Sequence, residues 1–431
     1  MKHKKSKDAK KALIIGIDGV PYGLLKELIE KGCMDGLKGI LKSGYTLNKM
    51  KASLPDISSV SWTSFMTGVN PGEHGIFGFT ELKPNTYEIS FPNSKDIKAP
   101  VFWKALTEKK LIKSSIIINI PNTYPAFPVD GILVSGFVAI DFDRAVYPSS
   151  YINTLKNMRY IIDVDLMKVR QDRDGFYKDL IESIKKRGNV SKWLLREKDW
   201  DLAIICITET DRLHHFFFKQ KETVLFDNFY KEVDYFITNT YKTAIEKYGD
   251  DILFLILSDH GFVDLDIEVN INAYLKDAGI LKIDKTKEFY EKIDNGTIAF
   301  AMDPGRIYIN YEDRFPRGSI GINESDKIKE MLKETLLNLK DNKGNRIIKA
   351  IFEKQDIYKG KYTKMAPDLV CIPYNGYDLK GNLRKEEIFT KDIFQGMHTW
   401  DNAVLIVPEK TKIEDDINIE FPCKIIMDFF S

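Results

Sequence analysis

The chain has 431 residues, of which 43% are hydrophobic, 12% aromatic and 29% charged. This supplies enough apolar material for a large core, because longer chains bury a larger share of their surface. The 64 Lys and Arg residues nearly balance the 63 Asp and Glu residues, giving a formal net charge of +1. Electrostatics therefore give no reason to expect duplex nucleic acid or an anionic membrane surface as the main partner.

The chain opens with a basic segment, residues 1–11, which we expect to be a disordered tail ahead of one domain at residues 12–431. No segment reaches the ~20 apolar residues that cross a bilayer, so no membrane span is expected. The apolar run after the tail is too short for a signal peptide, and a cytoplasmic location follows as the default. The cysteines are far apart in the sequence, which disfavours disulfides and a cysteine-based zinc site.

Short β-branched apolar runs alternate with helical periodicity along the chain. The apolar runs are residues 12–17, 113–120, 202–208 and 252–257, and the helical stretches are residues 24–31, 177–193 and 224–248. Continuous apolar runs of this length are typical of parallel strands that are buried on both faces. Their alternation with helices predicts an α/β fold, a three-layer α/β/α sandwich with a mostly parallel central sheet.

Three irregular stretches interrupt this alternation, near residues 82–100, 140–169 and 269–317. They are rich in Pro, aromatic or charged residues. We expect them to be inserted cap segments that cover the functional site and select the substrate.

Polar residues follow the apolar runs where each predicted strand ends. Asp18 follows the first run, Asp211 and His215 follow the third, and Asp259 and His260 follow the fourth. In open α/β sheets, functional groups collect beyond the carboxyl ends of the strands. Carboxylates and imidazoles in such a group suit a divalent metal such as Zn²⁺ or Mn²⁺.

The local spacing fits this interpretation. Asp211 and His215 are four residues apart, so they share a face if a helix follows the strand. Gly261 permits a tight turn in which Asp259 and His260 can both reach a metal. A single Asp after a strand is more often a helix N-cap, but the combination at successive strand ends predicts a metal centre.

A hydroxyl-bearing segment, LPDISSVSWTSFMTG at residues 54–68, has the pattern of a loop that opens a helix. A hydroxyl at a helix N-terminus is well placed to meet phosphate, because free backbone N–H groups and the helix dipole favour an anion there. Ser58, Ser59 and Ser61 are the candidates for a nucleophile, and each could instead cap the helix. The residues alone leave the three open.

The order of these motifs, namely GIDG, the serine loop leading into TGxxPxxHGI, TETDxxxH, SDHGF and a late histidine, resembles the type I phosphodiesterase/nucleotide pyrophosphatase family of the alkaline phosphatase superfamily. The resemblance covers about residues 12–400 and implies an alkaline-phosphatase-like fold with two divalent metal ions. Zn²⁺ is expected, with Mn²⁺ as the alternative. The implied ligands are Asp211, His215 and His398 for one ion, and Asp18, Asp259, His260 and the Ser58 oxygen for the other. His398 enters only through the resemblance.

The resemblance also implies a metal-dependent hydrolase that cleaves phosphodiester or pyrophosphate bonds of small-molecule phosphate esters through a phosphoserine on Ser58. The alternatives are a phosphoglycerate mutase-like phosphomutase of the same superfamily and a non-catalytic metal-binding protein on this fold. Phe79 stands where nucleotide pyrophosphatases have an Asn, so nucleotide specificity is not implied. Arg306 and Arg317 are candidates for binding the dianion of a phosphate monoester. Whether the chain forms a homo-oligomer is open.

Overall fold

The computed structural model describes residues 10–431, so residues 1–9 of the expected tail lie outside the described residues. Lys11 forms an ion pair with Asp201 at 2.8 Å, next to the first strand. Within residues 10–431, the largest sheet has eight strands in the order β2-β19-β9-β1-β8-β5-β6-β7. Its strands are β1 (Ala12–Ile17), β2 (Tyr45–Met50), β5 (Ser115–Ile118), β6 (Gly131–Val134), β7 (Val146–Tyr147), β8 (Leu202–Ile207), β9 (Leu253–Leu257) and β19 (Ala403–Pro408).

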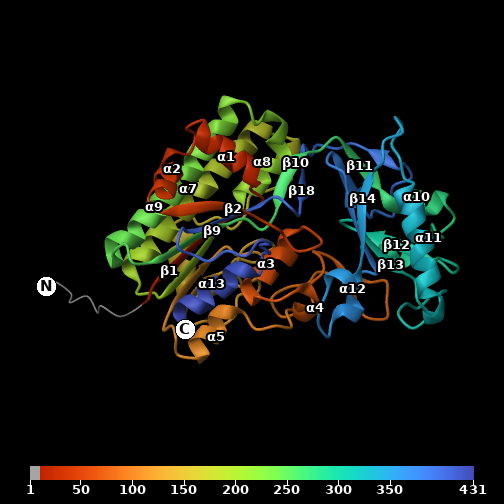
Figure 1. Cartoon of the computed structure of the whole chain (residues 1–431), viewed down its shortest axis with the longest axis horizontal. Helices are drawn as coiled ribbons and strands as arrows, with labels where there is room; N and C mark the ends of the chain where they lie inside the picture. The colour runs from red at the N-terminus through yellow and green to blue at the C-terminus, as the bar shows by residue number, and fades with distance from the viewer. Residues whose placement is uncertain (1–9) are drawn as a thin grey trace.

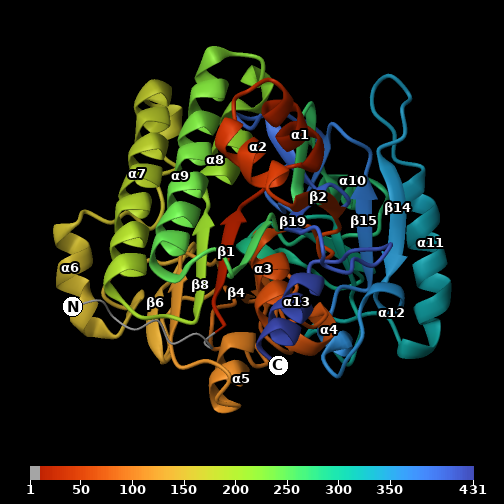
Figure 2. The same ribbon diagram turned by 60° about the vertical axis from the view of Figure 1, so that its left-hand side comes forward.

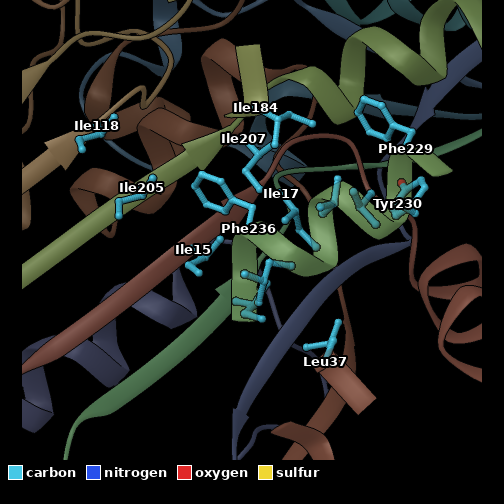
Figure 3. Close-up of a cluster of buried hydrophobic side chains, with 14 of the residues drawn as sticks. Ile15, Ile17, Leu37, Ile118, Ile184, Ile205, Ile207, Phe229, Tyr230 and Phe236 are labelled. Atoms are coloured by element: carbon cyan, nitrogen blue, oxygen red, sulfur yellow. The ribbon is translucent and has the colours of Figure 1, made fainter. Parts of the chain in front are cut away.

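The central strands β9, β1, β8, β5 and β6 run parallel, whereas β2, β19 and β7 pair antiparallel at the two edges. Strand β1 shows why the central strands have unbroken apolar sequences: both of its faces are buried. Its residues Leu13, Ile15 and Ile17 point into one core cluster, and Ala12 and Ile14 point into a second cluster on the opposite face. Figure 3 shows the first of these clusters.

Helices cover both faces of this sheet (Figures 1 and 2). The first core cluster holds residues of α1 (Tyr22–Glu30), α2 (Asp35–Lys42), α7 (Arg173–Glu197), α8 (Glu209–Phe217) and α9 (Val224–Tyr248). The second holds residues of α3 (Ser58–Thr67), α5 (Phe102–Glu108) and α13 (Phe421–Phe430). The predicted three-layer α/β/α fold with a mostly parallel sheet is therefore confirmed.

Between β9 and β19 the chain leaves this sheet and forms a smaller region of sheets and helices at residues 261–399. We call this region the second layer, and most of it lies on the right in Figure 1. One sheet has the order β12-β13-β15-β14, a second has the order β16-β11-β17, and β10 pairs with β18. The strands are β10 (Gly261–Asp264), β11 (Ile267–Asn270), β12 (Ala299–Met302), β13 (Arg306–Ile309), β14 (Ile348–Glu353), β15 (Leu369–Pro373), β16 (Tyr377–Lys380), β17 (Phe389–Thr390) and β18 (Gly396–Thr399), and the helices are α10 (Ile271–Asp277), α11 (Ser325–Leu337) and α12 (Lys354–Ile357). The stretch expected to be a cap at residues 269–317 is only part of this longer excursion.

The other two irregular stretches are shorter excursions. Residues 82–100 include most of a hairpin of β3 (Glu81–Leu82) and β4 (Ile89–Ser90), which follows the short helix α4 (Pro71–His74). Residues 140–169 include the edge strand β7 and the helix α6 (Ile152–Asn157). Among residues 10–431, no helix has the length and apolar character to cross a membrane.

Candidate metal centre

The predicted site residues come together beyond the carboxyl ends of β1, β8 and β9. Asp18 follows β1 directly, and its Oδ2 accepts a hydrogen bond from the Trp62 indole N–H at 2.9 Å. The next residue, Gly19, has φ +66° and donates its N–H to Asp259 Oδ1 at 3.0 Å. This positive φ favours glycine, and a side chain there would also meet the Phe262 ring 2.8 Å away. The GIDG turn thus links the ends of two neighbouring strands.

Asp211 and His215 both lie on α8, which starts two residues before Asp211. Because they are four residues apart on this helix, their side chains share one face, and Asp211 Oδ1 is 3.4 Å from His215 Nε2. The Thr210 hydroxyl donates to the Asp18 carbonyl oxygen at 2.6 Å, which ties the start of α8 to the end of β1.

Asp259 and His260 occupy the turn between β9 and β10, and His398 lies on β18. Strand β18 pairs antiparallel with β10, with His398 opposite Phe262. The His260 and His398 rings stack with their centroids 3.7 Å apart. Gly261 permits the tight approach, because a Cβ there would lie 2.6 Å from Thr399 Oγ1 and 2.8 Å from the Asn402 carbonyl oxygen.

The first cluster consists of Asp211, His215 and His398. Its three ligand atoms are 3.1 Å (His215 Nε2 to His398 Nε2), 3.3 Å (His398 Nε2 to Asp211 Oδ1) and 3.4 Å (His215 Nε2 to Asp211 Oδ1) apart. The His398 Nδ1–H donates to the Asp56 carbonyl oxygen at 2.8 Å, which leaves Nε2 with a free lone pair. Ligand atoms about 2.0–2.1 Å from a tetrahedral Zn²⁺ are about 3.3 Å apart, so this triangle has the size of a zinc site.

The second cluster consists of Asp18, Asp259 and His260, with Ser58 at its edge. The Ser58 hydroxyl donates to Asp18 Oδ1 at 3.2 Å, and its oxygen is also 3.2 Å from His260 Nε2. His260 Nε2 is 3.3 Å from Asp259 Oδ2 and 3.7 Å from Asp18 Oδ1. It is also 4.0 Å from Asp211 Oδ1, so the two clusters are adjacent.

The electrostatics of both clusters fit divalent cations. Asp18, Asp211 and Asp259 are all buried, and among the described residues Asp211 Oδ1 and Asp259 Oδ2 have no hydrogen-bond partner. Burial and then the nearby carboxylates raise the pKa of Asp18 well above its usual value, and burial raises the pKa of Asp259 to about 7. Burial and the charge of His398 lower the pKa of His260 to about 4, so its ring is neutral, as a metal ligand must be. A cation would compensate the carboxylates and use the free lone pairs.

The structure distinguishes the three serines by their contacts. Ser58 begins α3, and its hydroxyl contacts the second cluster. The Ser61 oxygen instead accepts the Ser53 N–H at 3.3 Å. The Ser59 oxygen is buried without a hydrogen-bond partner in the described part of the chain.

The ring nitrogens of the remaining motif histidines are bonded to groups other than the metal-ligand side chains. His214 donates its Nδ1–H to the Gly19 carbonyl oxygen at 2.8 Å and accepts from the Tyr230 hydroxyl at 2.7 Å. His74 accepts the Ile76 N–H at Nδ1 and contacts the Ser64 hydroxyl at 3.0 Å. Both are buried, in keeping with structural roles.

Sequence reasoning missed three residues that hold the ligands in place: Trp62 and Thr210, which bind Asp18, and Arg212. Arg212 bonds Asp211 Oδ2 at 2.9 Å and Asp163 at 2.8 Å, and it lies over the Phe137 ring. The position of Arg212 next to Asp211 was the available signal. The contribution of Asp163, from the stretch at 140–169, had no signal in the sequence.

A cavity of about 280 Å³ opens beside the first cluster. His215, His398, Asp56 and Phe79 are among its lining residues. Burial raises the pKa of Asp56 to about 6.

The two arginines considered as phosphate ligands are engaged elsewhere. Arg306 donates to the Thr80 and Asp303 carbonyl oxygens at 2.9 and 2.7 Å. Arg317 donates to the Ile293 carbonyl oxygen at 2.6 Å.

Comparisons with known proteins agree with this architecture. No curated protein matches the sequence. Among solved structures, phosphonoacetate hydrolase from Sinorhizobium meliloti 1021 in complex with phosphonoformate superposes with a TM-score of 0.68 at 13% identity, over 99% of this chain and 98% of that one. Murine ectonucleotide pyrophosphatase/phosphodiesterase 5, as an inactive variant in complex with AMP, gives a TM-score of 0.58 at 13% identity over 98% and 95% of the two chains. The human form of the latter protein gives a TM-score of 0.59 at the same identity and coverage.

At these identities the solved structures establish a shared fold. The family itself is established by the sequence, since the family model described as type I phosphodiesterase/nucleotide pyrophosphatase matches residues 12–401. The chain therefore belongs to the type I phosphodiesterase/nucleotide pyrophosphatase family.

Proposed function

We propose that this protein is a two-metal hydrolase of small-molecule phosphate esters that acts through a phosphoserine intermediate on Ser58. The observation that carries the proposal is the contact of the Ser58 hydroxyl with Asp18 and His260, beside a second cluster of Asp211, His215 and His398. Asp211, His215 and His398 would hold one ion, and Asp18, Asp259 and His260 would hold the other with the Ser58 oxygen. Zn²⁺ fits these donors, and Mn²⁺ is the alternative. The ions would supply Lewis-acid stabilisation of the attacking and leaving oxygens.

The residues of the chain determine how Ser58 meets its substrate. Because Ser58 begins α3, the unpaired N–H groups of the first helical turn and the helix dipole favour a phosphate next to its hydroxyl. The bond to Asp18 fixes the direction of the oxygen, and Trp62 in turn fixes Asp18.

In the first step, the Ser58 oxygen loses its proton to solvent and forms a bond to phosphorus, while the bond from phosphorus to the ester oxygen breaks and that oxygen takes up a proton and leaves as the alcohol. In the second step, water cleaves the phosphoserine ester and returns the hydroxyl. Ser58 is only 5% exposed as a residue, which limits access of nucleophiles larger than water.

The experiment that tests this function compares kcat/KM for bis-p-nitrophenyl phosphate and p-nitrophenyl phosphate, using protein loaded with Zn²⁺ or Mn²⁺. We expect the diester to be the better substrate. The candidates for binding a monoester dianion are Arg306 and Arg317, and both donate instead to backbone carbonyl oxygens. A clear preference for the monoester would change the assignment to a phosphatase. Metal-loaded protein without activity on either ester would contradict the proposed function.

A further inference from the structure

We propose that the cavity beside the first cluster selects phosphodiesters whose ester group carries a protonated amine, and that Asp56 pairs with this amine. The inference rests on the proposed function, since it concerns the substrate of the same site. It follows from the position of the cavity, from the charges on its wall and from the Asp56 carboxylate, which has no ion-pair partner within residues 10–431.

The position of the cavity makes it the natural place for an ester group. His215 and His398 belong to both the first cluster and the cavity lining. A phosphate held at this cluster would therefore place one of its ester groups in the cavity. The volume of about 280 Å³ accommodates a short alcohol and its terminal group.

The cavity wall carries more negative than positive charge. Its lining includes the carboxylates Asp56, Asp303 and Asp378 and a single ammonium group, Lys380. The Lys380 ammonium is bonded to Asp378 at 2.6 Å, so its charge is compensated within the protein. Asp303 accepts the Gly381 N–H and is also engaged.

Within residues 10–431, the carboxylates of Asp56 and Asp303 both lack an ion-pair partner, but of these two residues only Asp56 contacts a ligand of the first cluster. Its backbone carbonyl accepts the His398 Nδ1–H at 2.8 Å, which fixes this residue next to the cluster. Among the charged groups near it, His260 would lower the pKa of Asp56 when protonated, but burial holds that ring neutral, and Asp378 and Asp401 have the same sign of charge as Asp56. A partly enclosed carboxylate without a counter-charge is unfavourable, and a ligand cation would relieve that cost.

The aromatic wall favours the same class of ligand. Phe79 lines the cavity and packs edge-on against Phe137, with ring centroids 5.4 Å apart. An ammonium group is attracted to an aromatic ring, whereas a carboxylate or a further phosphate in this cavity would be repelled by Asp56. The cavity thus favours aminoalkyl phosphodiesters and disfavours esters with an additional anionic group.

The test uses three p-nitrophenyl phosphodiesters that differ only in the second ester arm: 3-aminopropyl, butyl and 2-carboxyethyl. The butyl arm is a neutral isostere of the aminopropyl arm. We expect kcat/KM to be about tenfold higher for the aminopropyl ester than for the butyl ester, equivalent to about 1.4 kcal/mol. The carboxyethyl ester is expected to be the poorest substrate.

Two variants assign the effect to a residue. Asp56→Asn should reduce the ratio of the aminopropyl to the butyl value to about twofold or less. Asp313→Asn, which removes a carboxylate from a separate cavity in the second layer, should keep the wild-type ratio. An unchanged ratio in Asp56→Asn would overturn the role of Asp56.

The outcomes separate this inference from the proposed function. Turnover of the butyl ester without a preference for the amine, or with a preference for the carboxylate, would overturn the inference alone. Absence of turnover on all three esters would contradict the proposed function. In that case calorimetric binding of the corresponding methylphosphonate monoesters still decides the inference, since the aminopropyl compound must bind more tightly than the butyl compound.

Discussion

Replacing each of the three serines in the serine loop separates catalysis from packing. Ser58→Ala removes the hydroxyl that contacts Asp18 and His260, both at 3.2 Å. Ser59 and Ser61 make different contacts: the Ser61 oxygen accepts the Ser53 N–H, and the Ser59 oxygen is buried without a hydrogen-bond partner in the described part of the chain. Loss of the nucleophile should lower kcat by at least about 10³-fold, in line with other enzymes that form covalent intermediates.

The other two variants should show the opposite behaviour. Ser61→Ala leaves the buried Ser53 N–H without its acceptor, which should lower the free energy of unfolding by about 1–2 kcal/mol while activity remains. Ser59→Ala removes a buried oxygen that has no partner among the described residues, so stability should change by less than about 0.5 kcal/mol.

The assay is turnover of bis-p-nitrophenyl phosphate, measured together with metal content and the urea midpoint for each variant. We expect Ser58→Ala to retain bound metal, because Asp18, Asp259 and His260 are unchanged. Activity within tenfold of wild type in Ser58→Ala would refute the assignment of the nucleophile. Loss of activity in Ser59→Ala or Ser61→Ala, with normal metal content, would transfer the role to that serine.

Three further predictions concern stability. Burial lowers the pKa of His74 to about 3 from an ordinary value near 6.5. As the pH falls, the His74 ring therefore takes up a proton in the unfolded chain but not in the folded protein. His74 should therefore destabilise the fold by about 2 kcal/mol between pH 6.5 and 4.5, and urea unfolding of His74→Gln should show a shallower loss over this range; equal slopes would contradict this. Arg187→Met should cost about 3–5 kcal/mol, because Arg187 and Glu209 form an ion pair with side chains only 0% and 1% exposed. A loss below about 1 kcal/mol would show that the pair is not needed for stability. If adding Glu209→Gln to Arg187→Met recovers no stability, the cost does not come from an unpaired Glu209 charge. Gly16→Ala places a Cβ 2.5 Å from the Trp62 ring and should cost about 1–3 kcal/mol, whereas Gly23→Ala meets open space and should change stability by less than about 1 kcal/mol; similar urea midpoints for the two would refute the packing argument.

The central strands could be predicted from the sequence because local patterns determine them. Strand β1 and helix α9 have the predicted bounds, since an apolar run buried on both faces and a long helical periodicity are each visible within one segment. The edge strand β2 and its neighbour β19 were not predicted. They form an antiparallel pair between segments over 350 residues apart, and β2 is mostly half-buried, so its pattern is weak. The sheets of the second layer depend on long-range pairing in the same way.

The arrangement of the site was predictable where it depends on neighbouring parallel strands. Asp18, Asp211 and Asp259 follow β1, β8 and β9, which are adjacent in the sheet and deliver their ends to one edge. The position of His398 depends on the pairing of β18 with β10, which no local pattern reveals. The choice among the serines depends on how far α3 is rotated, since each residue turns the side-chain direction by about 100°.

The most direct test of the central claim measures metal content and turnover in the same samples. Protein is stripped with a chelator, its metal content is checked by mass spectrometry, and Zn²⁺ is then added back while turnover of bis-p-nitrophenyl phosphate is followed. The two-metal assignment predicts no turnover in metal-free protein and full recovery as two equivalents of Zn²⁺ bind to wild type. Undiminished turnover by metal-free protein would contradict this assignment.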